Sequence, residues 1–216
     1  AAATGLGDVV SMLLRDGAEV DVLDSKGRTA IHLSAERGSL SAVQALLAAG
    51  GDSSLRYGKD KAFSELGLAA NYGHVEVMQA LIRHGVDVHT PDSNSCTALH
   101  SAAIGDEVEA IDTFIEDGAN INVQGGKYGT RSTPLHMASE KGSSEASLSL
   151  VKHGADVDRF YRELDSALRL AARGGHISIV KTLLAAGVRV NLRQAYWESA
   201  LDSACRGGHV NIVTTL

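Results

Sequence analysis

Apolar and polar positions alternate along this chain in short blocks that recur at a nearly constant interval. Each apolar block closes on a glycine, and successive glycines of this kind lie 33, 35, 33, 36 and 33 residues apart. These glycines are Gly17, Gly50, Gly85, Gly118, Gly154 and Gly187. A period near 33 residues predicts supersecondary units that stack on their neighbours, rather than one wrapped core.

Each period contains the signals of two helices. The block before the glycine has apolar residues at i, i+3 and i+4, as in Val43, Leu46 and Leu47, which predicts the second helix. The first helix is predicted to begin at a Thr or Ser N-cap and to continue with small residues, such as Ala69 and Ala70, that let neighbouring helices approach closely. The predicted N-caps are Thr29, Ser64, Thr97, Thr133, Ser166 and Ser199. A glycine between the two helices predicts a turn with positive φ. The inter-helix glycines are Gly38, Gly73, Gly142, Gly175 and Gly208.

The motifs of these units resemble those of the ankyrin repeat family along the whole chain. The best match is Thr133-Pro134-Leu135-His136, and variants of it begin at Thr29 and Thr97. The family's Gly-His pair follows the first helix at Gly73, Gly175 and Gly208. The resemblance implies an all-α repeat solenoid, in which helix-turn-helix pairs are joined by β-hairpin-like loops.

The resemblance implies that residues 1–216 form a single ankyrin array. Residues 1–23 are expected to be a partial repeat, and residues 194–216 a truncated one. The repeats between them are expected to open at Asp24, Lys59, Asp92, Tyr128 and Tyr161. Because terminal repeats of a solenoid need a polar outer face and neither end carries one, we expect a slice of a longer array.

Some positions depart from the family pattern. The hairpin glycine, present at Gly27, is replaced in five later hairpins, and this predicts irregular hairpins there. The replacing residues are Ala62, Ser95, Arg131, Leu164 and Trp197. In one repeat the inter-helix glycine moves to Gly105, and Asp106 stands in its usual place. This shift predicts altered local geometry within an unchanged fold.

Composition narrows the functional classes. A net charge of −6 disfavours nucleic acid as the main partner. No apolar run approaches the roughly 18 residues of a membrane-spanning helix, so no membrane insertion is expected. The two cysteines, Cys96 and Cys205, are far apart and form no motif, which indicates the cytoplasm or another reducing intracellular compartment. Residues 106–117 hold six acidic residues and no basic one, and form either a solvated outer helix face or an acidic docking strip.

The nine histidines do not indicate metal binding or catalysis, because nearly all of them occupy recurrent positions of the repeat. Cys96 and His100 are four residues apart near a helix start, but the repeat explains both. We therefore expect no enzyme in this segment, and no catalytic, cofactor-binding or metal-binding residue.

The resemblance implies a protein–protein interaction module or scaffold, which binds another protein through a concave groove of hairpins and first helices. The candidate partner-binding residues are Arg28, Arg37, Phe63, Tyr72, Asn94, Lys141, Arg162, Arg173, Tyr196, Trp197 and Arg206. The alternative is a regulatory array fused to an enzyme or channel domain outside this segment.

The arginines of the C-terminal half of the groove allow two interpretations. Arg162, Arg173 and Arg206 could bind an acidic or phosphorylated segment of the partner, since guanidinium groups pair with carboxylates and phosphates. Alternatively, acidic residues within the groove neutralise them. Those acidic residues are Glu163, Asp165, Glu198 and Asp202.

Overall fold

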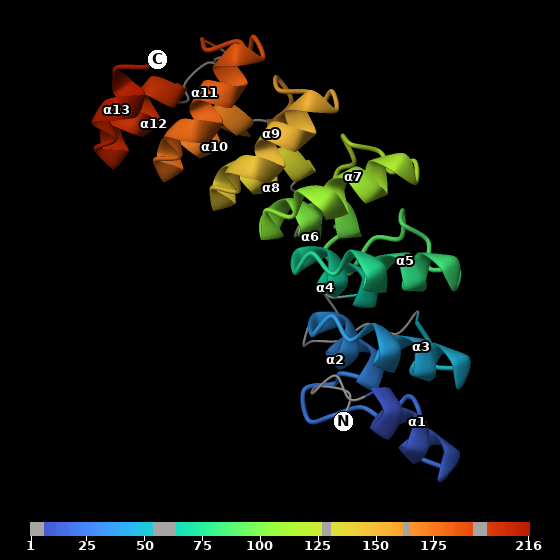
Figure 1. The fold of residues 1–216 in the computed structure, drawn as a ribbon. Helices are drawn as coiled ribbons and strands as arrows, with labels where there is room; N and C mark the ends of the chain where they lie inside the picture. The colour runs from blue at the N-terminus through green and yellow to red at the C-terminus, as the bar shows by residue number, and fades with distance from the viewer. Residues whose placement is uncertain (1–6, 54–63, 127–130, 162–164, 192–197) are drawn as a thin grey trace.

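The structure is a computed structural model, and it describes residues 7–53, 64–126, 131–161, 165–191 and 198–216. Figure 1 shows an arc of stacked helix pairs, with one helix of each pair along the inner side and the other along the outer side. The inner, first helices are α2 (Ala30–Glu36), α4 (Glu65–Asn71), α6 (Ala98–Gly105), α8 (Pro134–Lys141), α10 (Ala167–Gly174) and α12 (Ala200–Gly207). The outer, second helices are α1 (Gly7–Arg15), α3 (Leu40–Ala48), α5 (Val75–Arg83), α7 (Val108–Glu116), α9 (Ser144–Lys152), α11 (Ile177–Ala185) and α13 (Val210–Val213). The predicted all-α solenoid is therefore confirmed.

The N-cap predictions are confirmed at all six first helices. Each predicted Thr or Ser directly precedes its helix in an extended backbone conformation. At α4, for example, the Ser64 hydroxyl accepts a hydrogen bond from the backbone N–H of Gly67 at 3.0 Å. Such caps satisfy backbone donors that the helix itself leaves unpaired.

The turn between first and second helix has a left-handed backbone even where glycine is absent. Gly142 has φ of 85°, and Asp106 adopts the same conformation with φ of 65°. The Asp106 carboxylate accepts a hydrogen bond from the backbone N–H of Ala146 at 2.7 Å, at the start of α9. The expected altered geometry is thus absent from the backbone, because Asp106 adopts the left-handed conformation that aspartate tolerates better than most residues.

Two short antiparallel pairings mark the hairpins. The strands β1 (Phe160–Tyr161) and β2 (Asp165–Ser166) pair with each other, and Gly125 bridges Ser132. The predicted hairpin irregularity is wrong at two described positions, Ser95 and Arg131, whose φ values of 60° and 57° match the left-handed Gly27 at 77°. The other three replaced positions, Ala62, Leu164 and Trp197, lie outside the described residues. So do the expected openings at Lys59 and Tyr128 and the expected start of the truncated repeat at 194.

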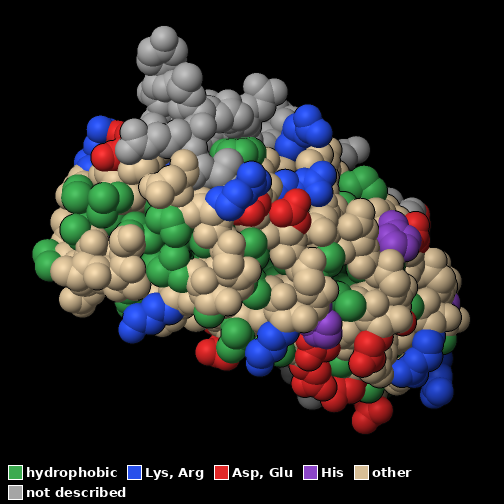
Figure 2. All heavy atoms as spheres, turned by 90° about the horizontal axis from the view of Figure 1, so that it is seen from above, with side chains coloured by type: hydrophobic (Ala, Val, Ile, Leu, Met, Phe, Trp, Pro, Cys, Tyr) green, Lys and Arg blue, Asp and Glu red, His purple; other side chains and the backbone are tan. Residues whose placement is uncertain are grey.

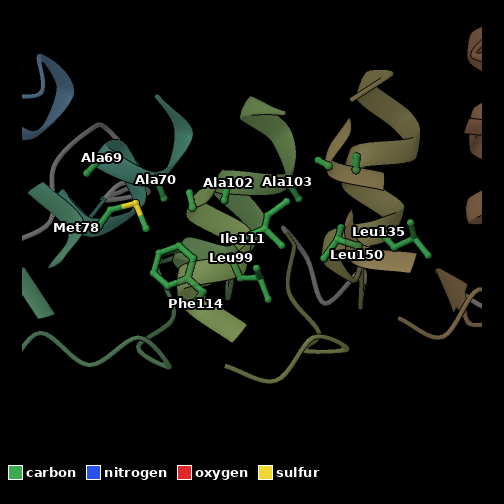
Figure 3. Close-up of a cluster of buried hydrophobic side chains, with 14 of the residues drawn as sticks. Ala69, Ala70, Met78, Leu99, Ala102, Ala103, Ile111, Phe114, Leu135 and Leu150 are labelled. Carbon is green, nitrogen blue, oxygen red and sulfur yellow. The ribbon is translucent and has the colours of Figure 1, made fainter. Parts of the chain in front are cut away.

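The core is a continuous layer between the two rows of helices. Small residues line the contact between neighbouring first helices, and Ala69, Ala70, Ala102 and Ala103 are all fully buried. Figure 3 shows these alanines above larger core side chains such as Phe114. Within the described residues, no helix is long and apolar enough to cross a membrane.

Candidate binding groove

The C-terminal ends of the first helices, which lie along the inner side of the arc (Figure 1), carry five of the seven predicted binding residues that the structure describes. Seven of the eleven candidates are described by the structure, namely Arg28, Arg37, Tyr72, Asn94, Lys141, Arg173 and Arg206. Phe63, Arg162, Tyr196 and Trp197 lie outside the described residues, so their part in the groove stays a prediction.

Arg28 forms its contacts within the hairpin that precedes α2 and with α2 itself. Its guanidinium bonds the Asp24 carboxylate at 2.9 Å and reaches Glu36 at 3.3 Å. The backbone N–H of Arg28 also donates to Asp24, and this bond is the largest of the contributions that hold the pKa of Asp24 below its usual value. Arg28 therefore stabilises the hairpin, and its charge is already paired with Asp24 and Glu36.

The arginines of the C-terminal half are paired with carboxylates of the groove itself. Arg173 lies 3.7 Å from Glu140 and 3.7 Å from Asp165, and Arg206 pairs with Glu198. These contacts support the interpretation that Asp165 and Glu198 neutralise the arginines of this half of the groove. A preference of this half for an acidic or phosphorylated partner gains no support from the geometry.

Two further residues of the C-terminal half of the groove, Arg169 and Asp202, stabilise the fold. Arg169, which stands where the family has histidine, bonds Asp165 at 2.7 Å and the backbone carbonyl of Glu198 at 3.3 Å. Asp202 accepts a hydrogen bond from the backbone N–H of Ser199 at 2.8 Å, and its own N–H donates to the Ser199 hydroxyl at 3.1 Å, so the two residues together cap α12. Glu163 lies outside the described residues.

The middle of the groove has a different character. Tyr72 is 49% exposed, and its ring stacks on the imidazole of His74, with ring centroids 6.2 Å apart. Ile104, on the neighbouring helix α6, is 36% exposed. Sequence reasoning assigned His74 only to the inter-helix turn and missed its contact with the tyrosine two residues earlier.

Asn94 lies at a hairpin tip. Its backbone carbonyl accepts a hydrogen bond from the N–H of Gly126 at 2.7 Å and joins consecutive hairpins. The backbone of Asn94 thus stabilises the stack, and its side chain stays a candidate contact.

The buried histidines of the first helices link neighbouring repeats. Nε2 of His100 lies 3.1 Å from the carbonyl oxygen of Ser132, and Nε2 of His136 lies 2.9 Å from that of Arg159. Burial lowers the pKa of both imidazoles to about 4. They are therefore neutral donors that connect one repeat to the next, not acid–base groups facing a substrate.

The Cys96 and His100 pair does not have the geometry of a nucleophile and its base. Burial raises the pKa of the Cys96 thiol to about 12, so the thiol stays protonated at neutral pH. The Nδ1 atom of His100 accepts the backbone N–H of Thr97 at 3.1 Å, and Nε2 faces Ser132. In the part of the chain that the structure describes, no three His, Cys, Asp or Glu side chains are placed to hold a metal ion.

The acidic segment on and around α7 is partly used for packing. The Asp112 carboxylate accepts a hydrogen bond from the Ser149 hydroxyl at 3.0 Å and contacts His153 at 2.9 Å. The side chains of Glu109 and Glu116 are exposed. Figure 2 shows acidic side chains gathered along one edge of the molecule, and acidic and basic side chains adjacent elsewhere on this face.

Comparison with known proteins gives the family of this fold. The family model for ankyrin repeats, in three copies, matches residues 1–88, 66–161 and 124–194. The chain therefore belongs to the ankyrin repeat family, whose repeats are generally protein-interaction modules.

Individual relatives share this array as part of longer proteins. A B-cell lymphoma 3 protein homolog from Mus musculus is 35% identical over 156 residues, which are 71% of this chain and 34% of that protein. Palmitoyltransferase ZDHHC17 from Danio rerio is 39% identical over 88 residues, which are 41% of this chain and 14% of the enzyme. The crystal structure of the human ASB11 ankyrin repeat domain superposes with a TM-score of 0.83, covers 99% of this chain and 94% of its own, and is 22% identical. The similarity to the ASB11 domain concerns the fold alone. The matched region spans 34% of the first sequence relative and 14% of the second.

Proposed function

We propose that this chain binds another protein through the concave groove formed by its hairpins and first helices. The observation that carries the proposal is the position of Tyr72 and Ile104. Both are exposed on neighbouring first helices in the middle of the array. The second helices α3, α5, α7, α9 and α11 bury their large apolar side chains, such as Phe114, and the exposed ones on second helices lie in the terminal helices α1 and α13. Exposed aromatic and aliphatic side chains between charged ones are typical of the centre of a protein interface.

The binding array also serves as a scaffold or regulatory part of a larger protein, and this is our second candidate function. It is supported by the relatives, which extend well beyond the matched region. The match covers 34% of the B-cell lymphoma 3 protein homolog and 14% of palmitoyltransferase ZDHHC17. An enzymatic or channel activity in such a protein would lie outside the present segment.

The segment itself is not catalytic and works in a reducing intracellular compartment. The best nucleophile candidate, Cys96, has a raised pKa, and the buried imidazoles of His100 and His136 are bonded between repeats. Cys96 and Cys205 are both free thiols, which is the state favoured in the cytoplasm.

Binding by the inner side can be separated from binding by the outer side. The outer side offers its own hollow of about 290 Å³ between α3 and α5, lined by residues that include Gln44 and Arg83. The partner is first identified by mass spectrometry after co-purification with the full-length protein. Its affinity is then measured for the inner variant Tyr72→Ala and for the outer variants Gln44→Ala and Arg83→Ala.

The proposal predicts that Tyr72→Ala weakens binding by about tenfold or more, as is common for a central aromatic contact. Gln44→Ala and Arg83→Ala should change the affinity less than about twofold, because exposed residues outside an interface contribute little. The opposite pattern would place the partner on the outer hollow and overturn the proposal.

A further inference from the structure

Four exposed side chains follow one another along the C-terminal ends of successive first helices. Arg37 is the C-cap of α2, Tyr72 is the C-cap of α4, Ile104 lies in the last turn of α6, and Lys141 ends α8. We call these four residues the open row. They run from a cation through an aromatic and an aliphatic side chain to a second cation.

The two cations of the open row differ from the other groove arginines. Arg28, Arg173 and Arg206 each pair with a carboxylate of the groove. Arg37 and Lys141 form no ion pair within the described part of the chain, and both are exposed. Their charge is available to a partner without the loss of an existing salt bridge.

The acidic residues next to the open row do not cancel these charges. Glu36 is held by Arg28 and Glu140 lies 3.7 Å from Arg173, while Asp106 accepts the N–H of Ala146. The Glu107 carboxylate lies against Gly73, beside the middle of the row. The row therefore has cationic ends, and in its middle the apolar side chains of Tyr72 and Ile104 lie near the Glu107 carboxylate, so an acidic side chain of a partner would avoid the middle.

The spacing of the row follows from the stack. Neighbouring packed helices lie about 10 Å apart, so Arg37 and Tyr72 are about 10 Å apart and Tyr72 and Lys141 about 20 Å. An extended peptide advances about 3.3 Å per residue. If an apolar side chain of the peptide contacts Tyr72, the peptide residue next to Arg37 is about three positions away in one direction. The peptide residue next to Lys141 is about six positions away in the other direction.

We infer that the open row binds an extended segment of a partner protein that carries one apolar anchor side chain with acidic residues on both sides. The anchor packs on Tyr72 and Ile104, and the acidic residues pair with Arg37 and Lys141. The inference rests on the proposed function and specifies its partner. In the competing explanation, the two cations only offset the negative ends of their own helices.

The test uses random 16-residue peptides displayed on phage and selected on the purified chain. We expect enrichment of an apolar residue with acidic residues about three positions to one side and about six to the other. Synthetic copies are then measured by fluorescence anisotropy. Arg37→Glu and Lys141→Glu should each weaken binding about five- to tenfold, since each reversal replaces an attraction by a repulsion.

Matched controls separate recognition from helix stability. Lys152→Glu reverses a charge at the end of α9 on the outer side, as Lys141→Glu does at the end of α8, and Arg83→Glu does so at the end of α5. All four variants place an acid at a helix C-terminus, and their melting temperatures should fall by similar amounts. Only the two variants in the open row should lose peptide affinity; the controls should change it less than about twofold.

Several results would overturn the inference. Selected peptides without acidic residues, equal losses in open-row and control variants, or a library that enriches no peptide would each contradict it. Peptides lost on Arg173→Glu but kept by the open-row variants would contradict the inference and leave groove binding intact. Peptides that are insensitive to every first-helix variant would contradict the proposed function as well.

Discussion

The Nε2 atom of His32 lies 3.4 Å from Oε1 of Glu65, and both side chains are almost completely buried, at 0% and 1% exposure. The backbone N–H of Thr29 donates to Nδ1 of the same ring, so Nε2 is the ring nitrogen that faces the carboxylate. This contact joins α2 to α4. The equivalent position in α8 holds Pro134, so the acidic residue is particular to this repeat.

Replacement of Glu65 by alanine should destabilise the chain strongly. Loss of the carboxylate removes a buried polar contact of the His32 ring, and the loss of one such partner typically costs about 1 to 3 kcal/mol of unfolding free energy. Urea unfolding followed by circular dichroism measures this cost. The control is Glu109→Ala on the exposed surface of α7, which should change stability by less than about 0.5 kcal/mol. Equal effects would mean that the His32 contact contributes nothing.

Acidification should destabilise the array before its carboxylates titrate. The folded-state pKa of His100 and His136 is lowered to about 4 from the ordinary value of 6.5. Between these values the unfolded chain binds more protons than the folded one, so stability is full above about pH 6.5 and is lost as the pH falls toward 4. Each histidine should account for about 2 kcal/mol between about pH 7.5 and pH 5.

The pH prediction is checked by comparison of unfolding free energies at the two pH values. His100→Gln and His136→Gln should each reduce the pH dependence, whatever their effect at neutral pH. Each variant is compared with the wild-type chain at both pH values. A wild-type pH dependence that persists in both buried-site variants would contradict the assignment.

Gly105 permits the close contact of α6 with α4. A Cβ atom at Gly105 would overlap the carbonyl oxygen of Asn71, which belongs to the backbone and cannot rotate away. Gly105→Ala should therefore lower stability by about 1 to 3 kcal/mol, as overpacking usually does. At Gly67, the same substitution meets only the hydroxyl oxygens of Ser64 and Ser101, at 3.1 and 3.2 Å.

Gly67→Ala is thus the matched control for Gly105→Ala. Alanine favours helix by about 1 kcal/mol over glycine, and the contacts at Gly67 are with side-chain hydroxyls, so Gly67→Ala should cost less stability than Gly105→Ala. Thermal melting of the two variants and the wild-type chain measures how each substitution changes the melting temperature. A stabilising Gly105→Ala would show that the two helices are not in close contact.

Ser95 should be improved by glycine and harmed by valine. Its φ of 60° is the left-handed conformation, in which a residue with a Cβ is disfavoured by about 1 kcal/mol or more. Ser95→Gly should raise the unfolding free energy by about 0.5 to 1 kcal/mol, and Ser95→Val should lower it. Equal melting temperatures for the two variants would contradict the left-handed assignment.

The repeat, the helix pairs and the six N-caps could be predicted from the sequence, because each depends on residues close together in the chain. The hairpin at Ser95 could not, although its cause is also local. The Asp92 carboxylate accepts the backbone N–H groups of Asn94 and Cys96 at 2.7 and 2.9 Å and holds the turn without glycine. Asp24 does the same at the glycine-containing hairpin, where it binds the N–H groups of Lys26 and Arg28. The absence of glycine alone therefore does not predict an irregular hairpin.

The charge state of the groove was the least predictable feature. Arg173 meets Glu140 from the preceding repeat, and the sequence does not show which rotamers bring two such side chains together. Arg37 and Arg173 look equivalent as sequence candidates, yet one is free of ion pairs among the described residues and the other contacts two carboxylates. Only the three-dimensional arrangement distinguishes an available charge from a neutralised one.

The central claim is that a partner protein occupies the inner side of the arc. Hydrogen–deuterium exchange of the chain with and without its co-purified partner tests this claim most directly. The account predicts added protection in the C-terminal turns of α2, α4, α6 and α8, and unchanged exchange in the outer helices α3, α5, α7 and α9. Protection confined to the outer helices would contradict it.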